Sequence, residues 1–158
     1  RDRFTSTIRR GSPDYLDPKL NCHSKLHEVQ ALVQAIEAGA DEALMLDIHG
    51  FVSTCNSTNF FMIKNGTVIT STDQYCMNGI TRQKIIEICK ENQIPVIENN
   101  FYIYDVYDAD ECFVTGTFAG LSPVISIDGR MIENKSNTKI SESLSSLYKK
   151  KISSYVKN

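Results

Sequence analysis

The chain has 158 residues, a formal net charge of −2 at pH 7 and 41% hydrophobic residues, so it is long enough for one well-cored domain and too short for two ordinary ones. Its slightly acidic charge, without a dense basic stripe, argues against a nucleic-acid partner. No apolar run approaches the roughly 20 residues that span a bilayer, so we expect no membrane partner.

The cysteines and histidines indicate no metal site. The five cysteines are scattered and form no CxxC pair, so the sequence predicts neither structural zinc nor a disulfide framework. His23 and His27 are four residues apart, but "HSKLH" lacks the acidic residue of the HExxH motif. Reduced thiols are typical of a cytoplasmic protein, which is the location we expect.

The first predicted helix runs from Ser24 to Ala38, where apolar residues recur every three or four positions. Ser24 is its expected N-cap and Gly39 its expected C-cap. The apolar positions of this amphipathic helix are Leu26, Val29, Leu32, Val33 and Ile36. Residues 1–18 are polar and contain two prolines, so we interpret them as a linker, and residues 19–158 as the folded domain.

Several strands are predicted after this helix. "EALMLD" is a short buried strand, and "GFVSTC" and "NFFMIKNGTVITS" form further strands with Asn65-Gly66 as a two-residue hairpin turn. A second helix is predicted within "NGITRQKIIEICKENQ", and Pro95 marks the start of an extended segment. The apolar positions of that helix are Ile85, Ile86, Ile88 and Cys89.

The remaining residues complete a mixed fold. "ECFVTGTFAGLSPVISIDGRMI" supplies two strands, with Asp128-Gly129 as a further turn, and "TKISESLSSLYKKKISSYVKN" forms a terminal amphipathic helix. The apolar face of this helix comprises Ile140, Leu144, Leu147, Tyr148, Ile152 and Tyr155. Because helices and strands alternate irregularly, we predict an α+β fold with a curled mixed sheet and flanking helices.

Three stretches of small polar residues share a chemistry suited to an anion. "CNSTN", residues 55–59, places hydroxyls and amides between two predicted strands. "GITR", residues 79–82, precedes a helix, so its free backbone N–H groups and the helix dipole favour a negative charge. "TGTFAG", residues 115–120, combines hydroxyls with glycines that allow close approach. Together the three would form a donor-rich cup for a phosphate, although each alone is more simply an ordinary turn.

The order of these motifs resembles the class IV aminotransferases, the fold-type IV pyridoxal-phosphate enzymes that include branched-chain and D-amino-acid aminotransferases. The resemblance is carried by "AGADEALMLD", "GITR", "ADECFVTGT" and "IDGR", and it extends from about Pro18 to Ile132. It implies the C-terminal large domain of the D-amino-acid aminotransferase-like fold, with a small N-terminal domain outside this chain. It also implies pyridoxal 5'-phosphate as the cofactor, an amino acid and a 2-oxo acid as substrates, and a homodimer.

Site residues follow from the resemblance by position. The residues that it assigns to the cofactor are Thr54, Ser57, Asn59, Ile80, Thr81, Gly116 and Thr117. The last four fall where the family offers donors to the cofactor phosphate, and Ser57 and Asn59 fall in the loop beneath the cofactor. Phe118 and Ala119 would lie beside the substrate carboxylate.

Two positions depart from the family pattern. Asn21 stands at the position of the Schiff-base lysine, and an amide cannot react with the cofactor aldehyde. Thr54 stands at the glutamate that pairs with the pyridine nitrogen, and a hydroxyl cannot balance a pyridinium charge. Lys25, about 6 Å further along a helix axis, is the candidate displaced lysine, and Lys19 is the other.

These departures leave more than one function open. The chain is either an aminotransferase, or a related lyase, with a displaced lysine, or a catalytically silent relative with a binding or dimerisation role. A third alternative is a truncated product whose missing half explains a lack of activity.

Overall fold

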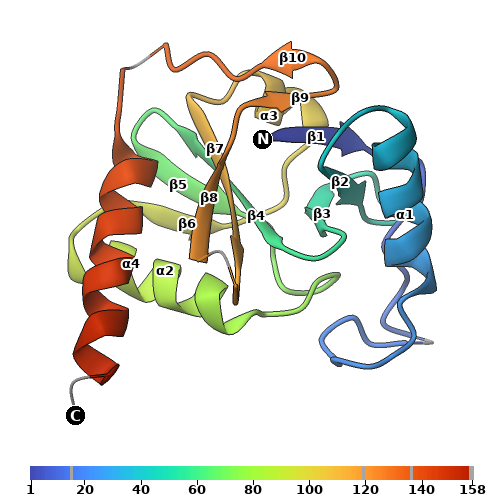
Figure 1. Ribbon diagram of the computed structural model, residues 1–158, viewed down its shortest axis with the longest axis horizontal. Helices are drawn as coiled ribbons and strands as arrows, with labels where there is room; N and C mark the ends of the chain where they lie inside the picture. The colour runs from blue at the N-terminus through green and yellow to red at the C-terminus, as the bar shows by residue number, and fades with distance from the viewer. Residues whose placement is uncertain (15, 119, 136, 157–158) are drawn as a thin grey trace.

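The computed structural model describes residues 1–14, 16–118, 120–135 and 137–156. Within these residues the chain forms two five-stranded sheets and four helices (Figure 1). Helix α1 (Leu26–Glu37) packs beside one sheet, whereas α2 (Ile80–Glu91) and α4 (Ile140–Val156) pack against the other. The mixed sheets with flanking helices confirm the predicted α+β class. Among the described residues, no helix is long and apolar enough to cross a membrane.

The first sheet has the strand order β10-β9-β1-β2-β3. Its strands are β1 (Asp2–Thr5), β2 (Glu42–Leu46), β3 (Val52–Cys55), β9 (Ser126–Ile127) and β10 (Arg130–Met131). Strand β1 is parallel to both neighbours, with Arg3 opposite Glu42 on one side and opposite Ile127 on the other. Residues 2–5, which the sequence interpretation placed in a linker, are therefore a central strand. The sequence pattern missed β1 because it has no apolar alternation, and its buried residue is an arginine paired with a glutamate.

The second sheet has the strand order β6-β5-β4-β7-β8. Its strands are β4 (Asn59–Lys64), β5 (Thr67–Thr70), β6 (Val96–Glu98), β7 (Glu111–Gly116) and β8 (Gly120–Val124). The predicted hairpin between β4 and β5 is confirmed, because Asn65 and Gly66 adopt φ values of 48° and 76° and the two strands pair antiparallel. The segment predicted to supply two strands supplies four, since β9 and β10 follow β8 and join the other sheet.

The core lies on both faces of the second sheet. One cluster fills the space towards the first sheet, and the other is covered by α2 and α4. The apolar face predicted for α2 is confirmed, because all four of its residues are buried. The face predicted for α4 is buried only in its first half: Leu144 is fully buried, whereas Ile152 and Tyr155 are exposed.

Two acidic residues, Asp105 in α3 (Ile103–Tyr107) and Glu111 at the start of β7, cap helices. The Asp105 carboxylate accepts a hydrogen bond from the Tyr102 backbone at the start of α3. Glu111 is buried and accepts hydrogen bonds from the backbone N–H groups of Ile140 and Ser141, at 3.0 and 3.1 Å. Because these are unpaired donors of the first turn of α4, Glu111 fixes the start of that helix.

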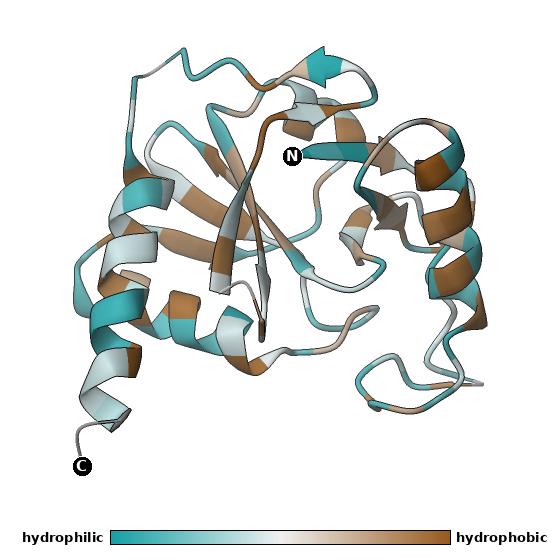
Figure 2. Ribbon diagram, viewed as in Figure 1, coloured by the Kyte–Doolittle hydropathy of each residue, from teal (hydrophilic) through white to brown (hydrophobic). Residues whose placement is uncertain are grey.

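Helix α1 buries its small residues and exposes its large ones. Ala31 and Ala35 are fully buried against β2, whereas the four residues Leu26, Val29, Val33 and Ile36 are between 48% and 67% exposed. Figure 2 shows these hydrophobic segments along α1 at the edge of the molecule. The amphipathic pattern therefore does not mark the buried face of this helix. Its N-cap is Lys25 rather than Ser24, and its C-cap is Ala38, with Gly39 following at a φ of 77°.

We expect substitutions on the two faces of α1 to differ in the size of their effect on stability. Val33→Gln should change the free energy of unfolding by less than about 0.5 kcal/mol, because the side chain is already half in water. Ala35→Leu should cost about 1–3 kcal/mol, since a larger side chain has no space against β2. Urea denaturation of both variants checks this. A larger loss for Val33→Gln than for Ala35→Leu would show that the exposed face is in fact covered.

Candidate functional site

The first two polar turns meet at Asn59, the first residue of β4. The Asn59 side-chain amide donates to the Met77 carbonyl at 2.8 Å, and the backbone N–H of Gly79 donates to the same carbonyl at 2.9 Å. A Cβ atom at Gly79 would lie 2.5 Å from the Asn59 side-chain oxygen Oδ1, so a larger residue there would displace the Asn59 side chain. The turn between β3 and β4 therefore lies directly against the residues that precede α2.

The third turn, between β7 and β8, lies on the other side of Asn59. Asn59 pairs with Thr115 across β4 and β7. A Cβ atom at Gly116 would be 3.3 Å from the Thr58 methyl group, so these two turns are also in close contact. The three stretches that the sequence analysis singled out are thus brought together at one end of β4 and β7, the inner strands of the second sheet.

This end of the sheet carries hydrogen-bond donors that have no acceptors among the described residues. Gly79 is the N-cap of α2 and provides no side-chain cap, so the backbone N–H groups of Ile80 and Thr81 have no capping acceptor there. The Thr115 hydroxyl is buried and, within the same part of the chain, has no hydrogen-bond partner. An uncapped helix N-terminus beside an unpaired hydroxyl fits a phosphate, because N–H groups and the helix dipole both favour an anion.

A groove of about 100 Å³ runs from the β3–β4 turn and Met77 to the start of α1. Its lining residues are Arg10, Lys25, Glu28, Thr54, Cys55, Asn56, Ser57, Thr58, Asn59 and Met77. Of the sequence-predicted residues, the structure thus brings Lys25, Thr54, Ser57 and Asn59 together. Burial raises the pKa of the Cys55 thiol, which therefore stays protonated and is no nucleophile.

The hydroxyl groups of the β3–β4 turn are bound within the protein. The Ser57 hydroxyl donates to Glu42 at 2.8 Å and the Thr58 hydroxyl donates to the same carboxylate at 2.9 Å. The Thr54 hydroxyl donates to the Thr58 carbonyl at 2.7 Å. A hydroxyl has a single proton to donate, so Thr54 can only accept a hydrogen bond from a group in the groove. The β3–β4 turn therefore forms the floor of the groove in a fixed shape, and its hydroxyl groups are not free to donate to a ligand.

Glu42 and Arg3 anchor this floor from below. Their side chains form an ion pair of 3.0 Å in which both are at least nine-tenths buried. The Arg3 Nε atom finds no hydrogen-bond partner among the described residues, so the glutamate is the main compensation for its charge. Sequence reasoning missed both residues. The available signal was Glu42 itself, a carboxylate at the start of a strand predicted to be buried.

The other predicted residues lie apart from the groove lining. Lys19 is half exposed and forms an ion pair with Asp73 at 3.9 Å, and Asn21 is exposed. Thr117 and Phe118 are exposed at the tip of the β7–β8 turn. Ala119 lies outside the described residues.

Comparison with known proteins identifies the fold that carries this groove. The family profile "Amino-transferase class IV" matches residues 2–127. The chain belongs to the class IV aminotransferase family. It is 38% identical over 146 residues to "Branched-chain-amino-acid aminotransferase-like protein 2" of Arabidopsis thaliana, a match that covers 92% of this chain and 26% of that protein. It is also 38% identical over 123 residues to a branched-chain-amino-acid aminotransferase of Pseudomonas aeruginosa, covering 78% of this chain and 40% of that protein.

Solved structures of the family share the architecture. The branched-chain aminotransferase of the thermophilic archaeon Thermoproteus uzoniensis, crystallised with norvaline, superimposes with a TM-score of 0.88 at 29% identity. The match covers 94% of this chain and 50% of that structure. A further branched-chain amino acid aminotransferase, crystallised with pyridoxamine 5'-phosphate, gives a TM-score of 0.88 at 31% identity. The chain spans between about a quarter and a half of the length of these relatives.

Proposed function

We propose that this chain is the cofactor-binding large domain of a pyridoxal-phosphate-dependent aminotransferase that resembles the branched-chain enzymes. Its substrates would be an amino acid and a 2-oxo acid. The observation that carries the proposal is the groove, because its lining includes both the Lys25 amine and the floor formed by Thr54–Asn59. The uncapped start of α2 lies at the end of this lining, next to Asn59 and Met77.

The residues present would suit the cofactor at its phosphate and at its ring nitrogen. The backbone N–H groups of Ile80 and Thr81 would hold the phosphate, together with Gly116 and Thr117, which the resemblance assigns to it. Thr54 would accept a hydrogen bond from a protonated ring nitrogen. When bound, the cofactor supplies an aldehyde that reacts with amines and a ring that withdraws electrons.

Lys25 is the residue that we assign to covalent attachment. Its amine would hold the cofactor covalently through the cofactor aldehyde, and once a substrate amine has displaced it, the free amine would be placed to take a proton from the substrate. Phe118 and Ala119 would contact the substrate carboxylate, as the resemblance implies. The proposal includes a homodimer. It also includes a cytoplasmic location, and the five free cysteines support this location because thiols stay reduced in the cytoplasm.

A second function is favoured by the two departures from the family pattern. Asn21 and Thr54 replace the lysine and the glutamate that the resemblance implies, while the three polar turns remain in contact with one another. A protein that binds the cofactor without transferring amino groups would have this combination. Mapping of covalent attachment separates the two functions.

We expect borohydride reduction of the protein with pyridoxal phosphate to place a pyridoxyl group on Lys25, because this amine alone among the described lysines lines the groove. Peptide mass mapping locates the group. Lys25→Met should abolish the label, whereas Lys19→Met, which removes an exposed lysine, should leave it unchanged. The measurement is best made on this chain and on a form extended to the length of its relatives.

Labels scattered over exposed lysines, with equal amounts in Lys25→Met, would contradict the enzymatic proposal. If such a protein still bound pyridoxal phosphate tightly without a covalent bond, the silent relative would be the correct function.

A further inference from the structure

A buried ion pair lies beside the proposed reactive amine. The Arg10 guanidinium contacts the Glu28 carboxylate at 2.5 Å, and the side chains are 9% and 15% exposed. Arg10 also donates from Nε to the Tyr75 carbonyl at 3.1 Å, which fixes its orientation. Its backbone N–H donates to the Leu46 carbonyl at 2.8 Å, so the segment that carries Arg10 is anchored along β2.

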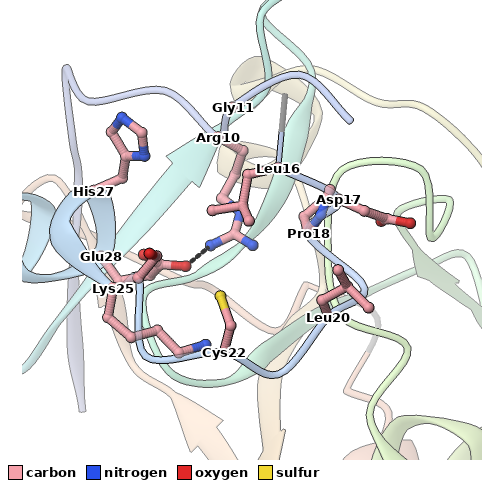
Figure 3. Close-up of a pocket in the computed structure, with 11 residues that line it drawn as sticks. Arg10, Gly11, Leu16, Asp17, Pro18, Leu20, Cys22, Lys25, His27 and Glu28 are labelled. Atoms are coloured by element: carbon pink, nitrogen blue, oxygen red, sulfur yellow. Dashed lines mark hydrogen bonds and ion pairs between the residues drawn. The ribbon is translucent and has the colours of Figure 1, made fainter. Parts of the chain in front are cut away.

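Arg10, Glu28 and Lys25 form the wall between two cavities. All three line the groove described above, and all three also line a neighbouring pocket whose other lining residues include Gly11, Leu16, Pro18 and Leu20. In Figure 3 the Glu28 carboxylate points towards Arg10, whereas the Lys25 side chain extends towards Cys22. Among the described residues Lys25 makes no ion pair.

The sequence spacing makes this arrangement unexpected. Lys25 is the N-cap of α1 and Glu28 lies three residues later in the first turn. Side chains at this spacing share a helix face and pair readily when their charges are opposite. A Lys25–Glu28 pair would stabilise the ammonium form of the lysine, and an ammonium group cannot attack a carbonyl carbon.

We propose that Arg10 is a positioning residue that sequesters the Glu28 carboxylate and so leaves the Lys25 amine free to react. The guanidinium outcompetes the ammonium for Glu28 because it is fixed in advance by the Tyr75 carbonyl and by its own anchored backbone. The catalytic value of this arrangement rests on the proposed function. The electrostatic effect of Glu28 on Lys25 does not depend on the proposed function.

The test measures the reactivity of Lys25 without any cofactor. Acetylation by acetic anhydride, from about pH 6 to about pH 10, reports the fraction of free amine at each lysine. Peptide mass spectrometry gives the ratio of Lys25 to Lys19, which lies outside both cavities and serves as the internal reference. The other titratable groups that line the two cavities, Asp17, Cys22, His27 and Cys55, are the same in every variant.

Arg10→Gln should lower the relative acetylation of Lys25 near pH 8 by about three- to tenfold and move its pH profile upwards, because the released Glu28 then pairs with Lys25. Glu28→Gln alone should not slow Lys25, and any change should be faster acetylation, since the unpaired Arg10 charge then disfavours the ammonium form of the lysine. The double variant Arg10→Gln/Glu28→Gln should return to the parent profile.

An unchanged profile in Arg10→Gln would overturn the inference. So would a double variant that stays as slow as the single one, because the loss would then come from a disturbed structure rather than from Glu28. Circular dichroism confirms that each variant is folded. If Arg10→Gln fails to fold, Arg10→Met, which keeps an apolar stem of similar length in the buried position, takes its place. If Lys25 follows the expected pattern but pyridoxal phosphate does not attach, the inference stands and the proposed function fails.

Discussion

Replacing Glu42 with alanine is expected to destabilise the protein by about 3–5 kcal/mol, the cost of leaving a buried charge without its partner. Arg3 would lose its ion pair within an interior where its Nε atom already lacks a hydrogen-bond partner among the described residues. The Ser57 and Thr58 hydroxyls would lose their acceptor at the same time. Chemical denaturation monitored by circular dichroism measures the loss.

A matched control separates this effect from the removal of any carboxylate. Glu87 pairs with Lys84 and Lys151 on the surface of α2, where solvent screens the charges. Glu87→Ala should therefore leave the denaturation midpoint nearly unchanged. Equal shifts for the two alanine variants would mean that the pair between Arg3 and Glu42 contributes no more than a surface pair.

The second large effect is expected at Phe113 in β7. This ring stacks on Phe61 with centroids 4.8 Å apart and an angle of 7° between the planes, and both residues are fully buried. Phe113→Ala should cost about 3–5 kcal/mol, because it removes the ring and leaves a cavity between the sheet and α2. Thermal or urea unfolding gives the value.

Phe118 provides the control, only five positions away. Its side chain is fully exposed at the tip of the β7–β8 turn, so Phe118→Ala should change stability by less than about 0.5 kcal/mol. A loss at Phe118 as large as that at Phe113 would indicate that the turn tip is packed against something in solution.

The sequence predicts those elements whose apolar pattern and burial coincide. The β4–β5 hairpin follows from Asn65-Gly66 between apolar runs, and the core face of α2 follows from its isoleucines. The apolar pattern fails where the buried residue is charged, as in β1, whose buried residue Arg3 forms an ion pair with Glu42. It also fails for α1, where the buried residues are alanines and close packing against β2 decides the orientation.

The candidate site divides in the same way. The three polar turns are visible in the sequence because their small residues are local signals for turns and helix starts. Their convergence on Asn59 depends on strand order, which no local signal gives. Arg10 and Glu28 are separated by 18 positions and meet only because the chain after β1 continues alongside β2.

Because β1 is central and pairs with a distant strand, we expect the first sheet to be completed late in folding. Asp2 and Ser126 are bonded across 124 positions of sequence, and within the described strands β1 has only β2 as a partner until β9 is in place. Closing so long a loop carries a large entropic cost before the contacts form, and folds that depend on distant pairings fold slowly. A chain that ends before β9 would leave the outer side of β1 with unpaired backbone groups, the feature that invites association between chains.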